Sequence, residues 1–488
     1  MTVELIGIIA LLIGIVSIFC EPAFIVRVFF CSTLLGSAAA FTLPALGGTN
    51  IQPAHLLLGF LAFKLVGSGD PKRLTAGFAI GRPGFWLMLT LIWSLISAYF
   101  LPRIFEGETF VFPARSTGYT LPLEPGTSNL TQSIYLIGDF VCFMLLYAYA
   151  STRAGRRVME DAALLCVALN LVFAALDLFT YYTNTAEILS FIRNANYGLL
   201  NDRELAGSKR IVGSFVEASS FGLMTIGYFA FSGKLWLEGV HPRLTLIFAG
   251  LSFGCLVFST SSTAFVGLGA FLIVAYLHTI FNALRRPPNP QTWWFIAGTP
   301  IAAPLVVVAI ALNESASNYF GNLLDELVFN KMSSESGIER SSWNAQGWQN
   351  FIDTFGFGVG NGSMRASSFP VSVLASLGAI GVLTMGLFLL TVFLSGLKGH
   401  DSPVRKAYRN ATKYACLAWL IGATVSGALV DLGLPFFAFA ALACSRVVSS
   451  FAVSNRTRLA APTRVPSVES IPMNHFASGL SISSRKQR

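Results

Sequence analysis

The stretch VSVLASLGAIGVLTMGLFLLTVFLSGL (371–397) decides the class of this protein. It is apolar from end to end and contains no Asp, Glu, Lys or Arg. About 20 apolar residues in an α-helix cross the hydrocarbon layer of a membrane, where no water satisfies an unpaired backbone group. The stretch therefore predicts a membrane-spanning helix.

The composition of the whole chain agrees with this prediction. Of the 488 residues, 54% are hydrophobic and only 12% are charged, and the mean hydropathy is +0.64. A soluble domain carries about 25% charged residues, and a soluble chain of this length would have to bury more apolar surface than its cores can hold. These values exclude a cytosolic enzyme, a disordered protein and a disulfide scaffold. They favour an all-α, polytopic membrane protein.

Similar apolar runs recur along the chain and predict roughly 11 to 13 spans. Residues 1–452 are expected to form one membrane domain. Residues 453–488 form a basic tail rich in Ser and Pro, without apolar periodicity, and disorder is expected there. The runs lie near 4–20, 23–45, 51–68, 84–102, 131–150, 158–182, 212–232, 244–260, 263–282, 293–312, 371–397, 414–430 and 433–452.

Basic residues are distributed unevenly between the two ends of these spans. About two thirds of the 33 Lys and Arg residues fall on one side, which the positive-inside rule assigns to the cytoplasm. Three long segments, 103–130, 184–211 and 314–370, then lie outside, and long loops of this kind usually carry function. Because the charge is scattered instead of clustered on one soluble face, nucleic acid is not an expected partner.

The first candidate motif, KRIVGSFVEASSFG (209–222), opens a span from the outer side. Glu217 follows Arg210 by seven residues, about two helical turns, so a helix would direct both side chains into one cavity. A carboxylate at that depth is costly in lipid and is expected to face water or a cation. A structural ion pair at a helix entrance explains the same residues, and the spacing favours neither interpretation.

The second candidate motif, KMSSESGIERSSWN (331–344), continues into apolar residues at helical spacing between Trp348 and Phe355. This pattern predicts an amphipathic helix on the outer membrane surface, with its Trp residues at the interface. Arg340 and Asn344 share its polar face. Solvated charge on a surface helix is the commoner reason for such a pattern, but it does not explain an Arg above a membrane cavity.

The third candidate motif, FGFGVGNGSMR (355–365), alternates glycine with other residues and ends on Arg365. Glycine permits sharp turns and lets the backbone approach a ligand closely. The motif lacks both the GK[ST] sequence and the strand–helix setting of nucleotide-binding loops. A turn beside an Arg is therefore its expected role.

Motifs that the sequence lacks narrow the chemistry. The five His residues do not cluster, and the sequence contains no HExxH, DxD or GxSxG motif. Neither a bound metal nor a Ser-His-Asp triad is expected, and no cofactor is predicted. Guanidinium groups remain, and Arg binds phosphate oxygens in a bidentate fork. A lipid that carries phosphate is the expected ligand.

Three motifs in order resemble those of the O-antigen ligase and Wzy-type polysaccharide polymerase superfamily. RIVGSFVEASSFG (210–222) resembles the family's Arg-x-x-Gly-x-Phe helix start, and FSTSSTAFVGLGA (258–270) resembles its Ser/Thr-rich hairpin. ERSSWNAQGWQNFIDTFGFGVGNG (339–362) and SSFPVSVLASLGAIGVL (367–383) resemble its long periplasmic loop and the helix that follows. The resemblance covers roughly residues 130–450.

This resemblance implies a GT-C-like, all-helical glycosyltransferase in the bacterial inner membrane, with its active site facing the periplasm. Such enzymes use an undecaprenyl-diphosphate-linked oligosaccharide as donor and need no metal. The resemblance places the diphosphate at Arg210 and Arg340. Membrane lipid, a chain-length regulator and a flippase are the other partners expected for such an enzyme.

Three departures from the family pattern bear on the activity. Glu-Ala-Ser at 217–219 stands where many members have His-Pro-Asn, and Ser-Ser at 261–262 stands where many have Ser-Arg. Ser-Ser at 367–368 stands where ligases typically have a His-Asn pair. The missing His favours an exopolysaccharide or O-antigen polymerase, with an O-antigen ligase as the alternative.

The expected reaction is metal-independent glycosyl transfer between two lipid-linked repeat units. Arg210 and Arg340 stabilise the charge on the departing diphosphate. Glu217 is the candidate general base for the acceptor hydroxyl, because a carboxylate in an apolar site binds a proton more readily than one in water. Glu335 and Glu339 are alternative bases. The residues expected to bind substrate are Lys209, Lys331, Glu335, Glu339, Trp343, Asn344 and Arg365.

Two other classes of protein fit parts of the sequence. A lipid-glycan transporter would carry ionisable residues deep in several spans, and Asp177 and Glu217 are the candidates for that role. A non-catalytic subunit of an envelope assembly would tolerate the loss of Arg340 but would depend on a lipid-facing Phe surface.

Overall fold

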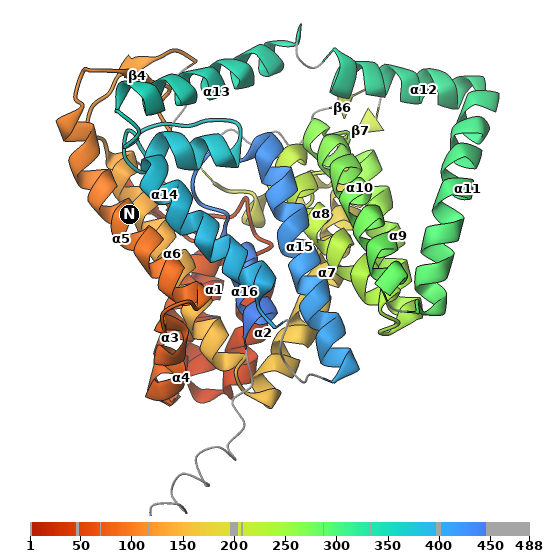
Figure 1. Cartoon of the computed structure of the whole chain (residues 1–488), viewed down its shortest axis with the longest axis horizontal. Helices are drawn as coiled ribbons and strands as arrows, with labels where there is room; N and C mark the ends of the chain where they lie inside the picture. Colours follow the sequence, from red (N-terminus) through yellow and green to blue (C-terminus); the bar gives the residue numbers. More distant parts are fainter. Residues whose placement is uncertain are drawn as a thin grey trace, which may run out of the picture. The chain divides into compact units, whose positions relative to one another are not determined.

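The chain is described by a computed structural model, in which an α-helical bundle carries three small β-sheets (Figure 1). The predicted tail at 453–488 and the candidate residue Lys331 lie outside the described part of the chain. The structure describes residues 2–44, 48–68, 70–114, 118–195, 204–205, 208–285, 287–330, 333–396 and 402–445.

Within the described residues, six helices are long and apolar enough to cross a membrane, which confirms a polytopic helical membrane protein. One of them, α11, buries none of its residues inside the protein. An apolar helix with no protein around it requires lipid as its solvent. The six helices are α5 (Pro83–Ile104), α6 (Thr127–Tyr149), α7 (Arg153–Tyr182), α10 (Ser262–Arg285), α11 (Pro290–Leu312) and α14 (Phe369–Leu394).

The other helices complete the bundle around a central pair, α8 (Ala218–Leu237) and α15 (Pro403–Ser426), which pack against each other. Aromatic rings fill the space beside this pair. The ring centroid of Trp419 on α15 lies 4.9 Å from that of Phe439, and its indole N–H donates to the carbonyl of Met224 on α8. The shorter apolar helices are α1 (Leu5–Phe19), α2 (Pro22–Ser32), α3 (Pro53–Ser68), α9 (Pro242–Phe258) and α16 (Leu434–Cys444).

Two predicted spans have wrong boundaries. The run at 23–45 is helical only to Ser32, because the small residues at 36–40 pack as turns and extended chain instead of continuing the helix. The run at 212–232 becomes helical only at Ala218. There the chain first turns at Gly213, whose φ of 60° is unfavourable for residues with a side chain.

Short strands and turns close the ends of the bundle. Strands β1 (Thr2–Val3), β2 (Phe41–Leu43) and β3 (Thr49–Ile51) form an antiparallel sheet in that order, with Thr2 opposite Thr42. The remaining small elements are the hairpins β4 (Phe110–Val111) with β5 (Leu121–Pro122) and β6 (Glu204–Leu205) with β7 (Ser208–Lys209), and the short helices α4 (Pro71–Thr75), η2 (Ala76–Phe78) and η3 (Ala186–Ile192).

The segment between α11 and α14 runs across one end of the bundle (Figure 1). It consists of α12 (Glu314–Leu324), a π-helical turn η4 (Asp325–Phe329) and α13 (Glu335–Asp353). The amphipathic helix predicted after Lys331 is confirmed as α13, with Trp343 buried and Trp348 exposed on its opposite face. This segment carries one of the candidate motifs to the end of the bundle where α8 and α14 begin.

The predicted glycine-rich turn at 355–365 connects α13 to α14. Gly360 has a φ of 93°, and a Cβ atom there would lie 2.6 Å from the carbonyl oxygen of Ser97 on α5. Glycine is needed at this point because the loop packs against the backbone of another helix. The loop is therefore held at a fixed position by the bundle.

Gly378 breaks α14 in its first half, with φ 63° and ψ −163° inside the helix. A Cβ atom there would collide with the carbonyl oxygens of Gly356 and Phe357. We expect Gly378→Ala to lower the free energy of unfolding by about 2–4 kcal/mol, through backbone strain and overpacking. Thermal unfolding in detergent measures the effect. The control is Gly386→Ala on the same helix, where a Cβ atom meets nothing within 4 Å; equal melting temperatures for both variants would contradict the prediction.

Candidate functional site

Two arginines lie close together where α13 meets the loop that follows it. The Cζ atom of Arg365 lies 3.9 Å from the centroid of the Trp343 ring. Its guanidinium group interacts electrostatically with Glu339 and Arg340 on α13 and with Glu217 at the start of α8. We call these five residues the guanidinium cluster. Three segments that are far apart in the sequence therefore meet at one charged site.

The backbone around Arg365 is fixed by hydrogen bonds to three other parts of the fold. The Arg365 N–H donates to the carbonyl of Phe112 at 2.9 Å, and the next residue donates to the carbonyl of Ala428 at 3.1 Å. The Ser367 N–H donates to Asn344 Oδ1 at 2.8 Å. Asn344, predicted to bind substrate, thus positions the loop that carries Arg365. A guanidinium group held in this way needs little reorganisation to bind an anion.

The charges in the guanidinium cluster leave hydrogen-bond donors available. Burial lowers the pKa of Arg365, and the nearby charge of Arg340 lowers it further. The carboxylates of Glu339 and Glu217 raise this pKa and so offset part of the shift. Arg365 Nε and Trp343 Nε1 are buried without a hydrogen-bond partner among the described residues. In that part of the chain Arg340 likewise has no hydrogen bond or ion pair. Two cations that interact electrostatically and keep open donors could hold an anion.

Glu217 lies at the N-cap position of α8, and the Ser219 hydroxyl donates a hydrogen bond to its carboxylate. The prediction that a helix carries both Arg210 and Glu217 is wrong, because the helix begins only at Ala218. The structure instead joins Glu217 to the second and third candidate motifs through Arg365. The N-terminus of α8 adds a positive dipole end to this site.

Asp177 anchors the segment that precedes Glu217. Its carboxylate accepts from Arg193 at 2.7 Å, pairs with Lys209 at 3.3 Å, and accepts the backbone N–H groups of Val212 and Gly213 at 2.8 and 3.1 Å. The three charged side chains are at most 6% exposed. This network fixes the turn that carries Arg210, and Asp177 is thereby satisfied inside the protein.

The remaining candidate residues separate into different surroundings. Lys209 belongs to the Asp177 network, so the ion pair that the sequence left open as an alternative involves this residue. Arg210 is half-buried directly after it, and Glu335 is exposed in the first turn of α13. The role of Asp177 and Arg193 was missed from sequence, because the only signal was two isolated charges near the ends of apolar runs.

Buried hydroxyls of the Ser/Thr-rich hairpin lie at the same end of α8. Gly222 of α8 packs against Ala264 of α10, with 3.0 Å between a Cβ atom built at Gly222 and the Ala264 side chain. Thr260, Ser261 and Thr263 have side-chain oxygens that are buried and make no hydrogen bond within the described residues. Such groups suit a ligand rich in hydroxyls. They were not predicted as site residues, although the sequence FSTSST was noted.

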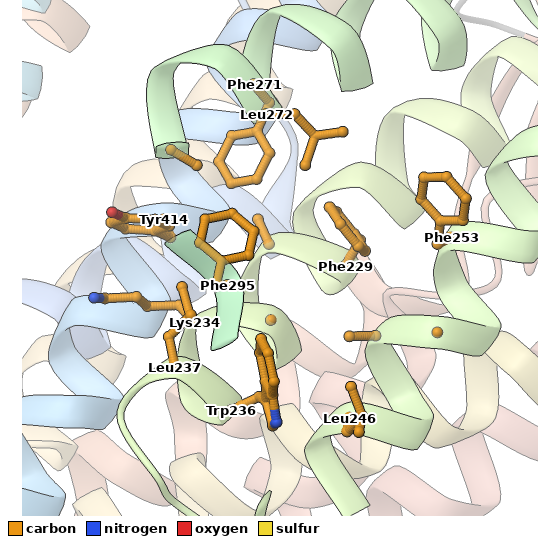
Figure 2. Close-up of a pocket in the computed structure, with 15 residues that line it drawn as sticks. Phe229, Lys234, Trp236, Leu237, Leu246, Phe253, Phe271, Leu272, Phe295 and Tyr414 are labelled. Atoms are coloured by element: carbon orange, nitrogen blue, oxygen red, sulfur yellow. The ribbon is translucent and has the colours of Figure 1, made fainter. Parts of the chain in front are cut away.

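A separate cavity of about 270 Å³ lies near the other end of α8 (Figure 2). Aromatic and aliphatic side chains from α8, α9, α10 and α11 line it, with Lys234 and Tyr414 at one side. Lys234 follows Glu217 by 17 positions, a distance of about 25 Å along a helix. The lining of the cavity suits a hydrocarbon chain and offers few reactive groups, so this cavity is not the candidate reaction site.

Comparison with known proteins gives no relative on which to base a function. No family model matches the chain, and no characterised protein or solved structure resembles it significantly. The structure shows a multi-pass helical membrane protein with a charged cluster at one end of the bundle. The guanidinium cluster and the groups around it are therefore the features that indicate a function.

Proposed function

We propose that this protein is a polysaccharide polymerase of the inner membrane, which joins glycan repeat units carried on undecaprenyl diphosphate. The observation that supports it most strongly is the approach of Arg340 and Arg365, whose donors are open, beside the carboxylate of Glu217. A diphosphate matches two adjacent guanidinium groups in charge and geometry. The long apolar helices around the site are suited to a substrate anchored in lipid.

In the proposed reaction, the acceptor hydroxyl forms a bond to the anomeric carbon of the donor sugar. The bond between that carbon and the diphosphate oxygen breaks, and the electron pair leaves with the diphosphate. Arg340 and Arg365 stabilise the charge that develops on the leaving group, and Arg210 is a third candidate for this role. Glu217 takes the proton of the acceptor hydroxyl. The hairpin hydroxyls of Thr260 and Ser261 bind the glycan.

Two features favour polymerisation on the outer face of the membrane. The guanidinium cluster lies at the end of the bundle crossed by α13, which the distribution of basic residues assigns to the periplasm. Ser367 occupies the place where the resembling ligases have a His, and its backbone N–H supports the loop of Arg365. A second lipid-linked repeat unit is therefore the proposed acceptor, and a ligase acceptor is the alternative.

We expect Glu217→Gln to reduce the rate of glycan joining by about 10²–10⁴-fold, because the amide cannot take the acceptor proton. Purified protein in liposomes with a lipid-diphosphate-linked oligosaccharide gives the rate from product length on gels. Glu335→Gln tests an alternative base, and Glu187→Gln is the control, because Glu187 is exposed in η3 and is not a candidate residue. Full activity in Glu217→Gln with loss of activity in Glu335→Gln would reassign the base.

A transporter of lipid-linked glycans is the second candidate function. The interior of the bundle holds ionisable groups that the proposed reaction does not use, among them Asp139 on α6. Ionisable residues at such depth are typical of proton-coupled transport. Movement of labelled lipid-linked glycan across liposomes, without any joining of repeat units, would favour this function over the transferase.

A further inference from the structure

A pair of carboxyl groups outside the guanidinium cluster joins α6 to the linker before α16. Asp139 lies near the midpoint of α6 and is 1% exposed. Asp431 belongs to the non-helical linker between α15 and α16, which covers residues 427–433. The imidazole of His55 on α3 interacts electrostatically with Asp431. The three groups come from different elements, and Asp139 is buried whereas Asp431 and His55 are half-buried.

The hydrogen bonding of this pair requires a proton. Asp139 Oδ2 is buried and receives a hydrogen bond from no donor group in the described part of the chain. Its carboxyl nevertheless lies within hydrogen-bonding reach of the Asp431 carboxyl. Two ionised carboxylates have only acceptor atoms, so the contact is a hydrogen bond only when one of the two groups is protonated.

The surroundings of the pair favour this protonated form. The negative charge of Asp177 is balanced by two cations and two backbone N–H groups. The charged neighbour of Asp139 is instead another carboxyl group, that of Asp431. The other titratable groups at the pair are His55 and Cys142, and the Tyr135 ring is tilted against the imidazole, with 5.1 Å between the ring centroids. His55 Nδ1 is also buried without a hydrogen-bond partner among the described residues. A second negative charge here would be costly.

We propose that Asp139 and Asp431 form a proton-binding site, which holds one proton between the two carboxyl groups and fixes the linker against α6. The linker in turn supports the loop of Arg365. The carbonyl of Ala428 accepts from the Ala366 N–H at 3.1 Å, and the carbonyl of Gly427 accepts from the Ser372 hydroxyl at 3.1 Å. Loss of the proton loosens this support, whatever reaction the guanidinium cluster performs.

The test uses Asp139→Asn and Asp431→Asn in the full chain, because each amide replaces the shared proton by a permanent donor. Folded wild-type protein retains the proton that the unfolded chain loses, so its stability falls as the pH rises through the titration of the pair. We expect the wild-type melting temperature to drop by roughly 2–4 °C more than that of either variant between about pH 5 and about pH 9. Because both variants keep His55, the difference in the drop of melting temperature between wild type and variants is due to the carboxyl pair.

Asp161→Asn is the matched control, because Asp161 is exposed on α7 and the same atoms are changed. The melting temperature of Asp161→Asn should depend on pH as that of the wild type does. The proposal is overturned if the melting temperatures of both carboxyl variants also show the wild-type dependence on pH. It is equally overturned if sodium chloride, compared with choline chloride at high pH, raises the melting temperature of wild type alone, since the ligand is then a metal cation. If only one of the two carboxyl variants folds, the pH dependence of its melting temperature decides whether the proposal holds.

Discussion

Arg340→Ala is expected to reduce the rate of glycan joining by about 10²–10³-fold, as the loss of one strong donor to a developing negative charge does in other enzymes. The reason is the position of Arg340 beside Arg365, with its own guanidinium donors open. In the proposed reaction, removing either cation would take one guanidinium group away from the departing diphosphate. Arg365→Ala is expected to have an effect of the same size and also to expose the Trp343 ring.

A binding measurement separates this prediction from a loss of folding. Inorganic pyrophosphate should raise the melting temperature of the wild-type protein and leave those of both variants unchanged, because ligand binding stabilises only the folded state. Arg103→Ala is the control. Arg103 also stacks on an aromatic ring, 4.1 Å from the centroid of Tyr99, but it is exposed and lies outside the guanidinium cluster. If pyrophosphate acts equally on all four proteins, Arg340 and Arg365 do not bind the diphosphate.

Asp177→Asn is expected to have the largest effect on stability, a loss of about 3–5 kcal/mol. The substitution removes the carboxylate that Arg193 and Lys209 share, and these side chains are 6% and 1% exposed. It also weakens the acceptor for the backbone of the turn after Arg210. Thermal unfolding in detergent and limited proteolysis of residues 204–217 measure the loss.

A double substitution tests whether the charge balance is the cause. Asp177→Asn combined with Lys209→Met removes one of the two cations that pair with Asp177, so it should recover part of the stability that Asp177→Asn loses. The sum of the stability losses of the two single variants would then exceed the stability loss of the double variant. If they simply add, the Lys209 charge is not the source of the destabilisation, and the lost hydrogen bonds to the turn are the better explanation.

The class of the fold could be predicted from the sequence because long apolar runs are a local signal. The span at 371–397 and the helix α13 depend on residue types within one segment, and both were predicted. The predicted span at 23–45 was wrong in its second half, since composition does not distinguish a helix from tightly packed small residues. Its second half forms turns and strand β2.

The candidate site was predictable in its residues but only partly in its contacts. Arg340, Arg365 and Glu217 were all selected from sequence, but their interaction depends on a loop held by β4 and by the linker after α15. Tertiary contacts of this kind leave no periodic pattern. The same holds for Asp139 and Asp431, since a single Asp in each of two distant apolar runs does not indicate that the two meet.

One consequence concerns α11, which buries no residue in the protein. It is attached at its start, where Asn289 donates to the carbonyl of Leu237 at 2.7 Å and Tyr276 donates to the carbonyl of Ile296 at 3.1 Å. Its other end leads through α12 to α13. An apolar helix that faces lipid along most of its length adjusts its tilt to match the thickness of the hydrocarbon layer. The thickness of the surrounding bilayer is therefore expected to act first on the tilt of α11 and on the position of α12, which follows it.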